Sequence, residues 1–148
     1  MKMNDRYLFR GKSKYNNEWI YGALVRLGKE SFSDPDRYGI TDKGIPIVNM
    51  NVCYNFQIDE VIPETVGQCT GLQDKNGEPI FEGDIVDVMH DPHYIGIAIQ
   101  RIGVFKVMFH EGCFMKRNEK GFFHFIPSDE CKIVGNVFDN PDLTEVEK

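Results

Sequence analysis

Apolar and polar residues alternate over short segments along most of the chain, which is the pattern of half-buried β-strands. The clearest case is the segment 52–58, in which Val52, Tyr54, Phe56 and Ile58 fall on one face of an extended chain. Gly, Pro, Asn and Asp separate such segments at intervals of several residues. No stretch supports a helix of more than a turn or two, so the pattern predicts a mostly β protein with little helix.

Applied along the whole chain, the same pattern predicts a series of short strands. They are expected at 7–10, 18–25, 45–50, 52–58, 66–72, 85–88, 95–99, 104–109, 113–117, 122–126 and 132–138. The polar segment 29–44, which is broken up by Pro and Gly, is expected to be a loop or a short excursion. The segment 59–64 is expected to link two halves of the fold, with a boundary near Pro63.

The stretch 66–88 has the strongest turn chemistry in the chain. Asp74-Lys75-Asn76-Gly77 is a turn signal, because Asp favours the first turn position and Asn and Gly tolerate positive φ. Gly67 and Gly71 indicate a bulge or a close backbone approach, and Pro79 indicates an edge position. A second turn precedes Asp84, whose side chain is expected to hydrogen-bond the turn backbone. Two turns around a short apolar segment are typical of the corner of a small barrel.

Several of these segments carry more specific information when they are taken together. They are Phe9-Arg10-Gly11, Glu18-Trp19-Ile20-Tyr21-Gly22, Thr70-Gly71-Leu72, Asp74-Lys75-Asn76-Gly77, Ile80-Phe81-Glu82-Gly83-Asp84-Ile85-Val86 and Ile133-Val134-Gly135-Asn136-Val137. In composition and order they resemble the YopX family, which consists of small proteins of bacterial phages and prophages. The resemblance covers nearly the whole chain, except the loop 31–46 and the tail after Pro141.

The resemblance implies a mostly β fold with an SH3-like barrel in the C-terminal half, joined to an N-terminal β region. It implies no catalytic residues, because the family has none assigned. With the boundary near Pro63, we expect an N-terminal β region at 1–64, a barrel at 65–141 and a charged tail at 142–148. A single compact unit is the alternative.

Charge and composition narrow the classes of function. The 17 Lys and Arg against 23 Asp and Glu give a net charge of −6, which disfavours non-specific nucleic-acid binding. No apolar run reaches the roughly 20 residues that span a bilayer, and no signal peptide is visible, so no membrane partner is expected. The four cysteines are scattered without a CxxC pair, which indicates reduced thiols in a cytoplasmic protein; disulfides are the less favoured alternative.

Two pairs of potential zinc ligands invite a metal hypothesis. They are His90 with His93, and His110 with Cys113. If the strands between them form an up-down-up meander, the two loops meet at the same end of the sheet, and the four side chains can close a tetrahedral site. Exposed loop histidines with a packed thiol are the favoured alternative, so we expect no cofactor.

Catalytic patterns are missing from the sequence, and an enzyme is therefore not expected. There is no glycine-rich phosphate loop followed by Lys and Ser or Thr, and no Gly-x-Ser-x-Gly motif. Cys113 and His110 are close in sequence, but closeness alone does not align a nucleophile with its base. Asp84 and Asp87, three positions apart on a strand, point to opposite faces and cannot converge.

An aromatic and basic hairpin is the best candidate for a binding surface. Its candidate contact residues are Phe114, Lys116, Arg117, Phe122, Phe123 and Phe125. We expect a non-enzymatic phage or prophage accessory protein that uses this hairpin to self-associate, as a homo-oligomer, or to bind a host or phage protein. The alternative is a barrel that binds single-stranded nucleic acid with the same residues.

Overall fold

The computed structural model describes residues 7–28, 33, 35–41, 58–89, 103–124 and 130–144. The chain divides into two compact units, Met1–Gln68 and Cys69–Lys148, and each is described by itself. The predicted strands at 45–50 and 95–99, and all but the last residue of the one at 52–58, lie outside the described residues. The domain boundaries expected from the sequence stay a prediction.

The first unit is an antiparallel sheet whose strands run in the order β4-β3-β2-β1-β5. The strands are β1 (Phe9–Lys12), β2 (Trp19–Gly28), β3 (Arg37–Thr41), β4 (Asp59–Val61) and β5 (Gly67–Gln73). β1 and β2 form the predicted hairpin, in which Lys12 pairs with Trp19. Asn17 lies in its turn with a φ of 61°, a conformation that Asn tolerates better than most residues. Gly67 and Gln68 of β5 pair with β1 at the end of the unit.

Two strands of this unit were not predicted. β3 lies inside the segment expected to be a loop, and β4 lies inside the segment expected to be a link. Both carry few apolar residues, and a shared ion pair compensates: Arg37 of β3 donates to Glu60 of β4 through Nε at 3.0 Å and Nη2 at 2.7 Å. The expectation of a loop at 29–44 and of a link at 59–64 is therefore wrong where these strands lie.

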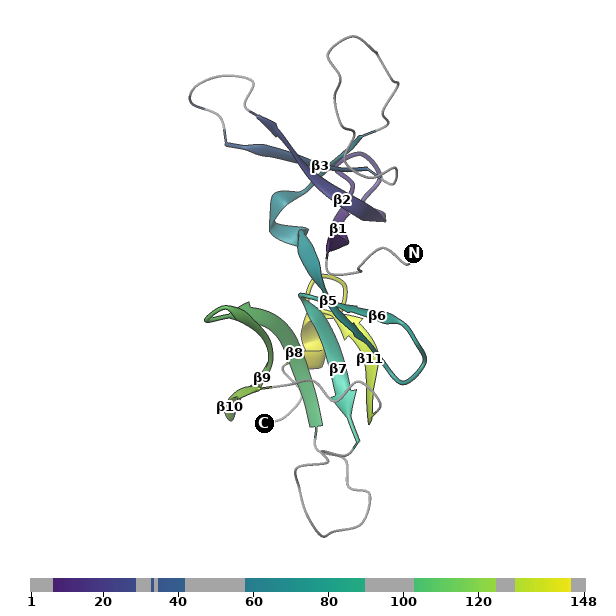
Figure 1. The fold of residues 1–148 in the computed structure, drawn as a ribbon, viewed down its shortest axis with the longest axis vertical. Helices are drawn as coiled ribbons and strands as arrows, with labels where there is room; N and C mark the ends of the chain where they lie inside the picture. Colours follow the sequence, from purple (N-terminus) through teal and green to yellow (C-terminus); the bar gives the residue numbers. More distant parts are fainter. Residues whose placement is uncertain are drawn as a thin grey trace. The chain divides into compact units, whose positions relative to one another are not determined.

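The second unit begins within β5, whose Cys69 and Gln73 pair with β6 (Pro79–Phe81) across a register shift. The shift and the φ of 80° at Gly71 confirm the predicted bulge. Its main sheet has the order β10-β9-β8-β7-β11. The strands are β7 (Asp84–Val88), β8 (Gly103–His110), β9 (Cys113–Asn118), β10 (Gly121–His124) and β11 (Cys131–Asn136). Figure 1 shows β9 and β10 curving away from β7.

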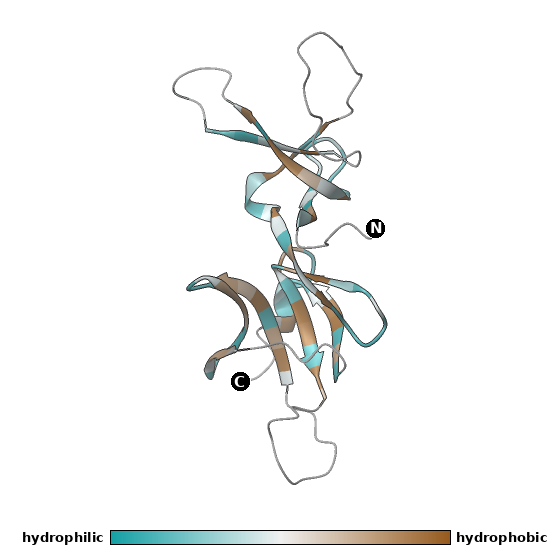
Figure 2. Cartoon of the chain, viewed as in Figure 1, coloured by the Kyte–Doolittle hydropathy of each residue, from teal (hydrophilic) through white to brown (hydrophobic). Residues whose placement is uncertain are grey.

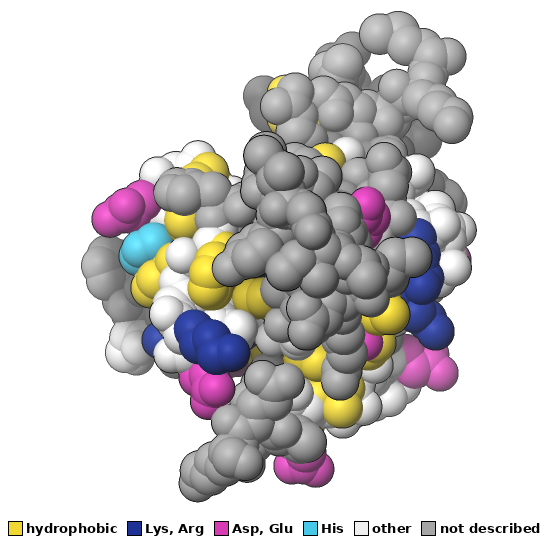
Figure 3. Space-filling model, turned by 90° about the horizontal axis from the view of Figure 1, so that it is seen from below, with side chains coloured by type: hydrophobic (Ala, Val, Ile, Leu, Met, Phe, Trp, Pro, Cys, Tyr) yellow, Lys and Arg dark blue, Asp and Glu magenta, His cyan; other side chains and the backbone are white. Residues whose placement is uncertain are grey.

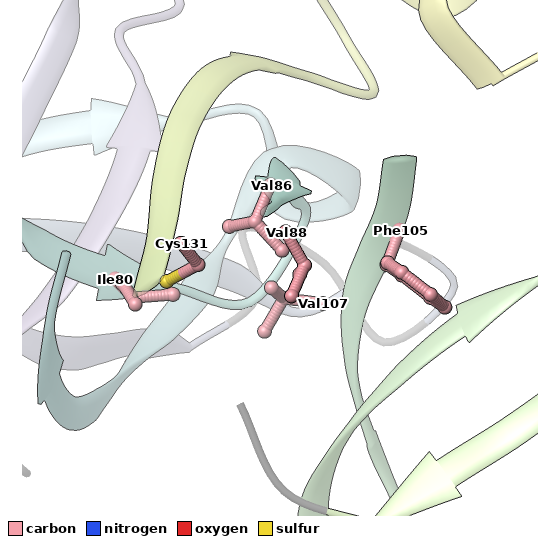
Figure 4. Packing of buried hydrophobic residues seen from close by; sticks show 6 residues of the cluster. All are labelled: Ile80, Val86, Val88, Phe105, Val107 and Cys131. Atoms are coloured by element: carbon pink, nitrogen blue, oxygen red, sulfur yellow. The ribbon is translucent and has the colours of Figure 1, made fainter. Parts of the chain in front are cut away.

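The core of the second unit lies on one face of this sheet. Its buried side chains are Ile80, Val86, Val88, Phe105, Val107 and Cys131, and Figure 4 shows them converging from β6, β7, β8 and β11. The alternation of buried and less buried residues along β8 follows the two-residue period of a strand. Figure 2 shows the same hydrophobic character along β7 and β8.

The turn between β5 and β6 holds the outer edge of β11. The Asp74 side chain accepts hydrogen bonds from the amides of Asn76 at 2.7 Å and Glu78 at 3.1 Å, which builds the predicted turn. The same carboxylate accepts from the amide of Ile133 in β11 at 3.1 Å. The amide of Lys75 also donates to the carbonyl oxygen of Cys131 at 3.0 Å. The turn thus supplies a hydrogen-bond acceptor to the edge of a strand 59 residues away.

The next turn confirms the role predicted for Asp84. This residue is 1% exposed, and its Oδ2 accepts a hydrogen bond from the amide of Phe81 at 2.8 Å. A short 3₁₀ turn, η4 (Pro141–Thr144), contacts β8, and a second, η2 (Pro63–Thr65), lies in the first unit. Gly135 of β11 lies against the side chains of Asn140 and Leu143, so a larger residue at this position would force these side chains to shift.

The strand directions on which the zinc hypothesis depended are not found. β7 pairs directly with β8 in antiparallel register, with Val88 opposite Gly103 and Ile85 opposite Lys106. The two strands therefore run toward opposite ends of the sheet. The described strands form antiparallel sheets with little helix, which confirms the mostly β class. The SH3-like barrel stays a prediction. Among the described residues, no helix has the length and apolar character needed to cross a membrane.

Candidate interaction surface

Three consecutive strands, β8, β9 and β10, present the predicted aromatic hairpin. A two-residue turn joins β8 to β9, and its residues Glu111 and Gly112 have φ values of 48° and 86°. This turn places His110 directly opposite Cys113. The second turn places Asn118 opposite Gly121, and the Asn118 side chain accepts from the amide of Lys120 at 2.9 Å. These two turns set the register of every pair across the three strands.

Consecutive residues of a strand point to opposite faces of the sheet, so the side chains of Phe122 and Phe123 lie on opposite faces of β10. Phe123 lies opposite Lys116, on the face that carries the core, and its ring meets the buried ring of Phe105 edge-on with centroids 5.6 Å apart. Phe122 lies opposite Arg117 on the other face. The two rings are 37% and 42% exposed, respectively, although each has a neighbour within its own chain.

The ring of Phe122 has two polar neighbours. The imidazole of His110 stacks on it with centroids 4.4 Å apart and an angle of 13° between the planes. The guanidinium carbon of Arg117 lies 4.8 Å from the ring centroid, which is a cation–π distance. Figure 3 shows a histidine beside hydrophobic side chains on one face, with charged side chains around them. These contacts hold the Phe122 ring in place and occupy part of its surface.

A second aromatic pair lies next to the turn between β8 and β9. Phe109 and Phe114 face each other across the strands, with ring centroids 5.2 Å apart and nearly perpendicular planes. Phe109 is 50% exposed, the largest exposure among the described phenylalanines. Neither Phe109 nor His110 was among the predicted contact residues. Their β-strand alternation was visible in the sequence, but the three-strand curvature that brings His110 to Phe122 was not.

The predicted contact residues have different surroundings. Arg117 is exposed, and Phe114 is half-buried. Lys116 is 2% exposed, and its ammonium nitrogen lies 5.1 Å from the centroid of the Phe105 ring. Its charge therefore faces the core side of the sheet and is not presented at the surface. Phe125 lies outside the described residues.

The proposed zinc ligands are only partly described. His90 and His93 lie outside the described residues, and the part of the chain that the structure describes contains no cluster of three or more His, Cys, Asp or Glu side chains suited to a metal. The condition for convergence is not met, because β7 ends beside Gly103 and His110 stands at the other end of β8. The Cys113 sulfur contacts the carbonyl oxygen of His110 at 3.6 Å, which is a main-chain contact and not a thiol–imidazole pair.

One ionic cluster stands out in the first unit. Glu60 is buried, and it accepts hydrogen bonds from Arg37 and from the ammonium of Lys14, at 2.6 Å in the latter case. The hydrogen bond from Arg37, and then that from Lys14, lowers the pKa of Glu60 to about 2. All three charges are used within the sheet, so this cluster is structural.

Comparison with known proteins agrees with the fold. The sequence model of the family described as YopX protein matches residues 8–145. No curated protein matches the chain significantly. The chain is similar to the crystal structure of protein EF1440 from Enterococcus faecalis, with a TM-score of 0.52 and 24% sequence identity over 92% of this chain and 96% of the other. At this identity the likeness shows the fold alone.

Proposed function

Since the chain belongs to the YopX family, whose match covers residues 8–145, we propose that it is a non-enzymatic accessory protein that acts by binding another protein. The proposed contact is the strand β10 together with the rings of Phe122 and Phe123. We propose that it acts in the cytoplasm of an infected or lysogenic bacterium, a proposal supported by the sequence resemblance to phage and prophage proteins. We also propose that the curved sheet of the second unit corresponds to the SH3-like barrel of the resemblance.

The observation that carries the proposal is the exposure of aromatic side chains next to an edge strand. Phe109, Phe122 and Phe123 are each more than a third exposed, and Phe122 and Phe123 lie on β10 itself. Among the described strands, β10 ends the sheet order, so its outer side pairs with no strand of that sheet. An edge strand offers main-chain donors and acceptors, and aromatic residues are the side chains most enriched where proteins bind each other.

The chemistry of the surface supports binding over catalysis. The polar groups at Phe122 are an imidazole stacked on the ring and a guanidinium beside it, and both contact an aromatic ring. A catalytic nucleophile needs a base within hydrogen-bonding distance, and the Cys113 thiol contacts a carbonyl oxygen instead.

Single-stranded nucleic acid is the weaker candidate partner. A base would have to stack on Phe122, whose ring already has His110 and Arg117 as neighbours. The Lys116 charge is buried, which leaves fewer cations for phosphates on a chain whose net charge is −6.

The test is affinity capture of the tagged chain from its bacterial host during prophage induction, with and without nuclease. We expect a protein partner that survives nuclease and is lost with Phe122→Ser. Val134→Ser is the matched control, because Val134 is similarly exposed, at 39%, on the other edge strand β11. Recovery of nucleic acid that nuclease removes, or equal capture by both variants, contradicts the proposal.

A further inference from the structure

We infer that the partner of β10 is a second copy of the same chain, which pairs with it edge to edge about a two-fold axis. This inference rests on the proposed function and names its partner. Two antiparallel β10 strands would join the two curved sheets into one continuous sheet across the axis. Closed two-fold dimers are the commonest symmetric assemblies of soluble proteins.

The two edges of the sheet differ in how they are protected. The turn between β5 and β6 covers the outer side of β11: Asp74 accepts a hydrogen bond from the amide of Ile133, and the amide of Lys75 donates to the carbonyl oxygen of Cys131. The pairing of β11 with β7 also shifts in register between Ile133 and Gly135. Bulges and covering loops are ways in which proteins block strand addition, as are Pro and charged residues on an edge. β10 has the sequence Gly-Phe-Phe-His, and it contains no Pro, Lys or carboxylate. Among the described residues, the β11 edge of the sheet is thus covered by a turn, whereas no described loop is seen to cover the β10 edge.

The exposed area shows that the main chain must take part. Phe122 and Phe123 are 42% and 37% exposed, which is about 160 Å² per copy if a fully exposed ring residue presents roughly 200 Å². A stable interface buries about 800 Å² per partner. The rings alone supply about a fifth of that area, so a specific contact needs the β10 backbone and its flanking residues. A four-residue strand gives an interface at the small end of the range, and we therefore expect a reversible, concentration-dependent dimer.

The surroundings of the strand favour a register centred on Phe122. In an in-plane pairing, directly opposite residues share a face, so the centre falls on a residue. Centring on Phe123 would oppose two rings on the face that carries the core, where each packs edge-on against a buried Phe105, whereas Phe122 lies on the other face. Centring on Phe122 places Phe123 of one copy opposite Gly121 of the other. A Cβ built at Gly121 meets nothing within 4 Å, so the space above this glycine is open to a ring.

The Arg117 charges do not oppose this register. The exposed Arg117 lies one strand in from β10 on each copy, opposite Phe122. The two Arg117 residues are then separated by three strand spacings, about 14 Å. This exceeds the screening length of about 8 Å at physiological salt, so their repulsion is weak. The two Phe122 rings lie between them.

The test replaces Phe122, at the two-fold axis, by Glu or by Lys. Dimerisation is measured by sedimentation velocity and native mass spectrometry over a wide range of protein concentration. We expect the unmodified chain to dimerise and both Phe122→Glu and Phe122→Lys to raise the dimer dissociation constant by roughly tenfold or more, because like charges then face each other. A mixture of the two variants should recover a heterodimer. Val134→Glu and Val134→Lys, alone and mixed, should behave as the unmodified chain. Far-UV circular dichroism checks that all variants are folded.

A second measurement introduces no charged side chain into β10. Phe122→Cys in a Cys113→Ser background should form an intermolecular disulfide on mild oxidation, because directly opposite residues lie within disulfide range. Val134→Cys in the same background should not.

A chain that stays monomeric at the highest concentration, or a mixture that fails to form heterodimers, overturns the inference. If such a monomeric chain still captures a host or phage protein through Phe122, the proposed function stands and only the self-pairing is wrong. If Phe122→Ser also leaves capture unchanged, the proposed function fails with it.

Discussion

Replacement of Asp74 is expected to release β11 from the turn that covers its edge. The Asp74 carboxylate is 5% exposed and accepts hydrogen bonds from three main-chain amides, those of Asn76, Glu78 and Ile133. A hydrogen bond to a charged group contributes roughly 1.5–3 kcal/mol, and a buried amide that loses its acceptor costs about 1–3 kcal/mol. Because the three bonds share one carboxylate, their sum is an upper bound. We expect Asp74→Ala to lower the free energy of unfolding by about 3–5 kcal/mol.

Asp74→Asn removes the charge of the carboxylate but keeps the shape of the side chain, so it tests the contribution of the charge. One amide oxygen can still accept from the turn, but the amino group then faces the donor of Ile133, so we expect a smaller loss of about 1–2 kcal/mol. Burial raises the pKa of Asp74, but the hydrogen bonds from Ile133, Asn76 and Glu78 lower it by more, so the pKa lies below its ordinary value of 3.8. The stabilisation by the carboxylate is therefore present above about pH 4 and is lost as the pH falls below it. The stability difference between the native chain and Asp74→Asn should shrink over that fall in pH.

The assay is urea denaturation at neutral and acidic pH, combined with hydrogen–deuterium exchange of the β11 amides. Glu78→Gln is the matched control, because it changes an exposed charge in the same turn and leaves the Asp74 carboxylate in place. Asp74→Ala should speed exchange at Ile133 more than at Phe105 in the sheet interior. A loss below about 1 kcal/mol, or unchanged exchange at Ile133, would show that the turn does not anchor β11.

Two further predictions concern other contacts within the units. Gly135→Ala would bring a methyl group against the Asn140 side chain and to 3.0 Å from Leu143, so we expect a loss of about 1–3 kcal/mol; a thermal unfolding temperature equal to that of the native chain would contradict it. Glu60→Gln should destabilise the first unit at neutral pH but not near pH 2. The pKa of Glu60 is lowered from its ordinary value of 4.5 to about 2, so the stabilisation by its carboxylate is fully present above pH 4.5 and is lost progressively as the pH falls toward 2. Trp19 fluorescence during unfolding reports on that unit, and a pH-independent difference would refute the ionic role.

Local turn chemistry was the part of the fold that the sequence could predict. The turn at 74–77 and the bulge at Gly71 follow from residue types that adopt positive φ more readily than others. β3 and β4 were missed because they are short: their buried apolar side chains, Ile40 and Val61, are too few to give a period, and main-chain pairing and the ion pair of Arg37 with Glu60 leave none. The direct pairing of β7 with β8 was missed for a different reason. The connection between them is long, and nothing local in the sequence states which strands become neighbours across it.

The composition of the candidate surface was predicted, but its orientation was not, although the sequence contained enough to derive it. Side chains alternate with a period of two, so a basic residue on β9 faces either the core or the solvent according to register. The two-residue turn after β8 pairs His110 with Cys113, and counting back along both strands places Lys116 opposite Val107, whose face carries the core. Continuing the count through the next turn places Phe123 on that face and Phe122 with Arg117 on the other. A run of adjacent basic and aromatic residues therefore divides between two faces, and a binding surface inferred from such a hairpin should contain alternate residues.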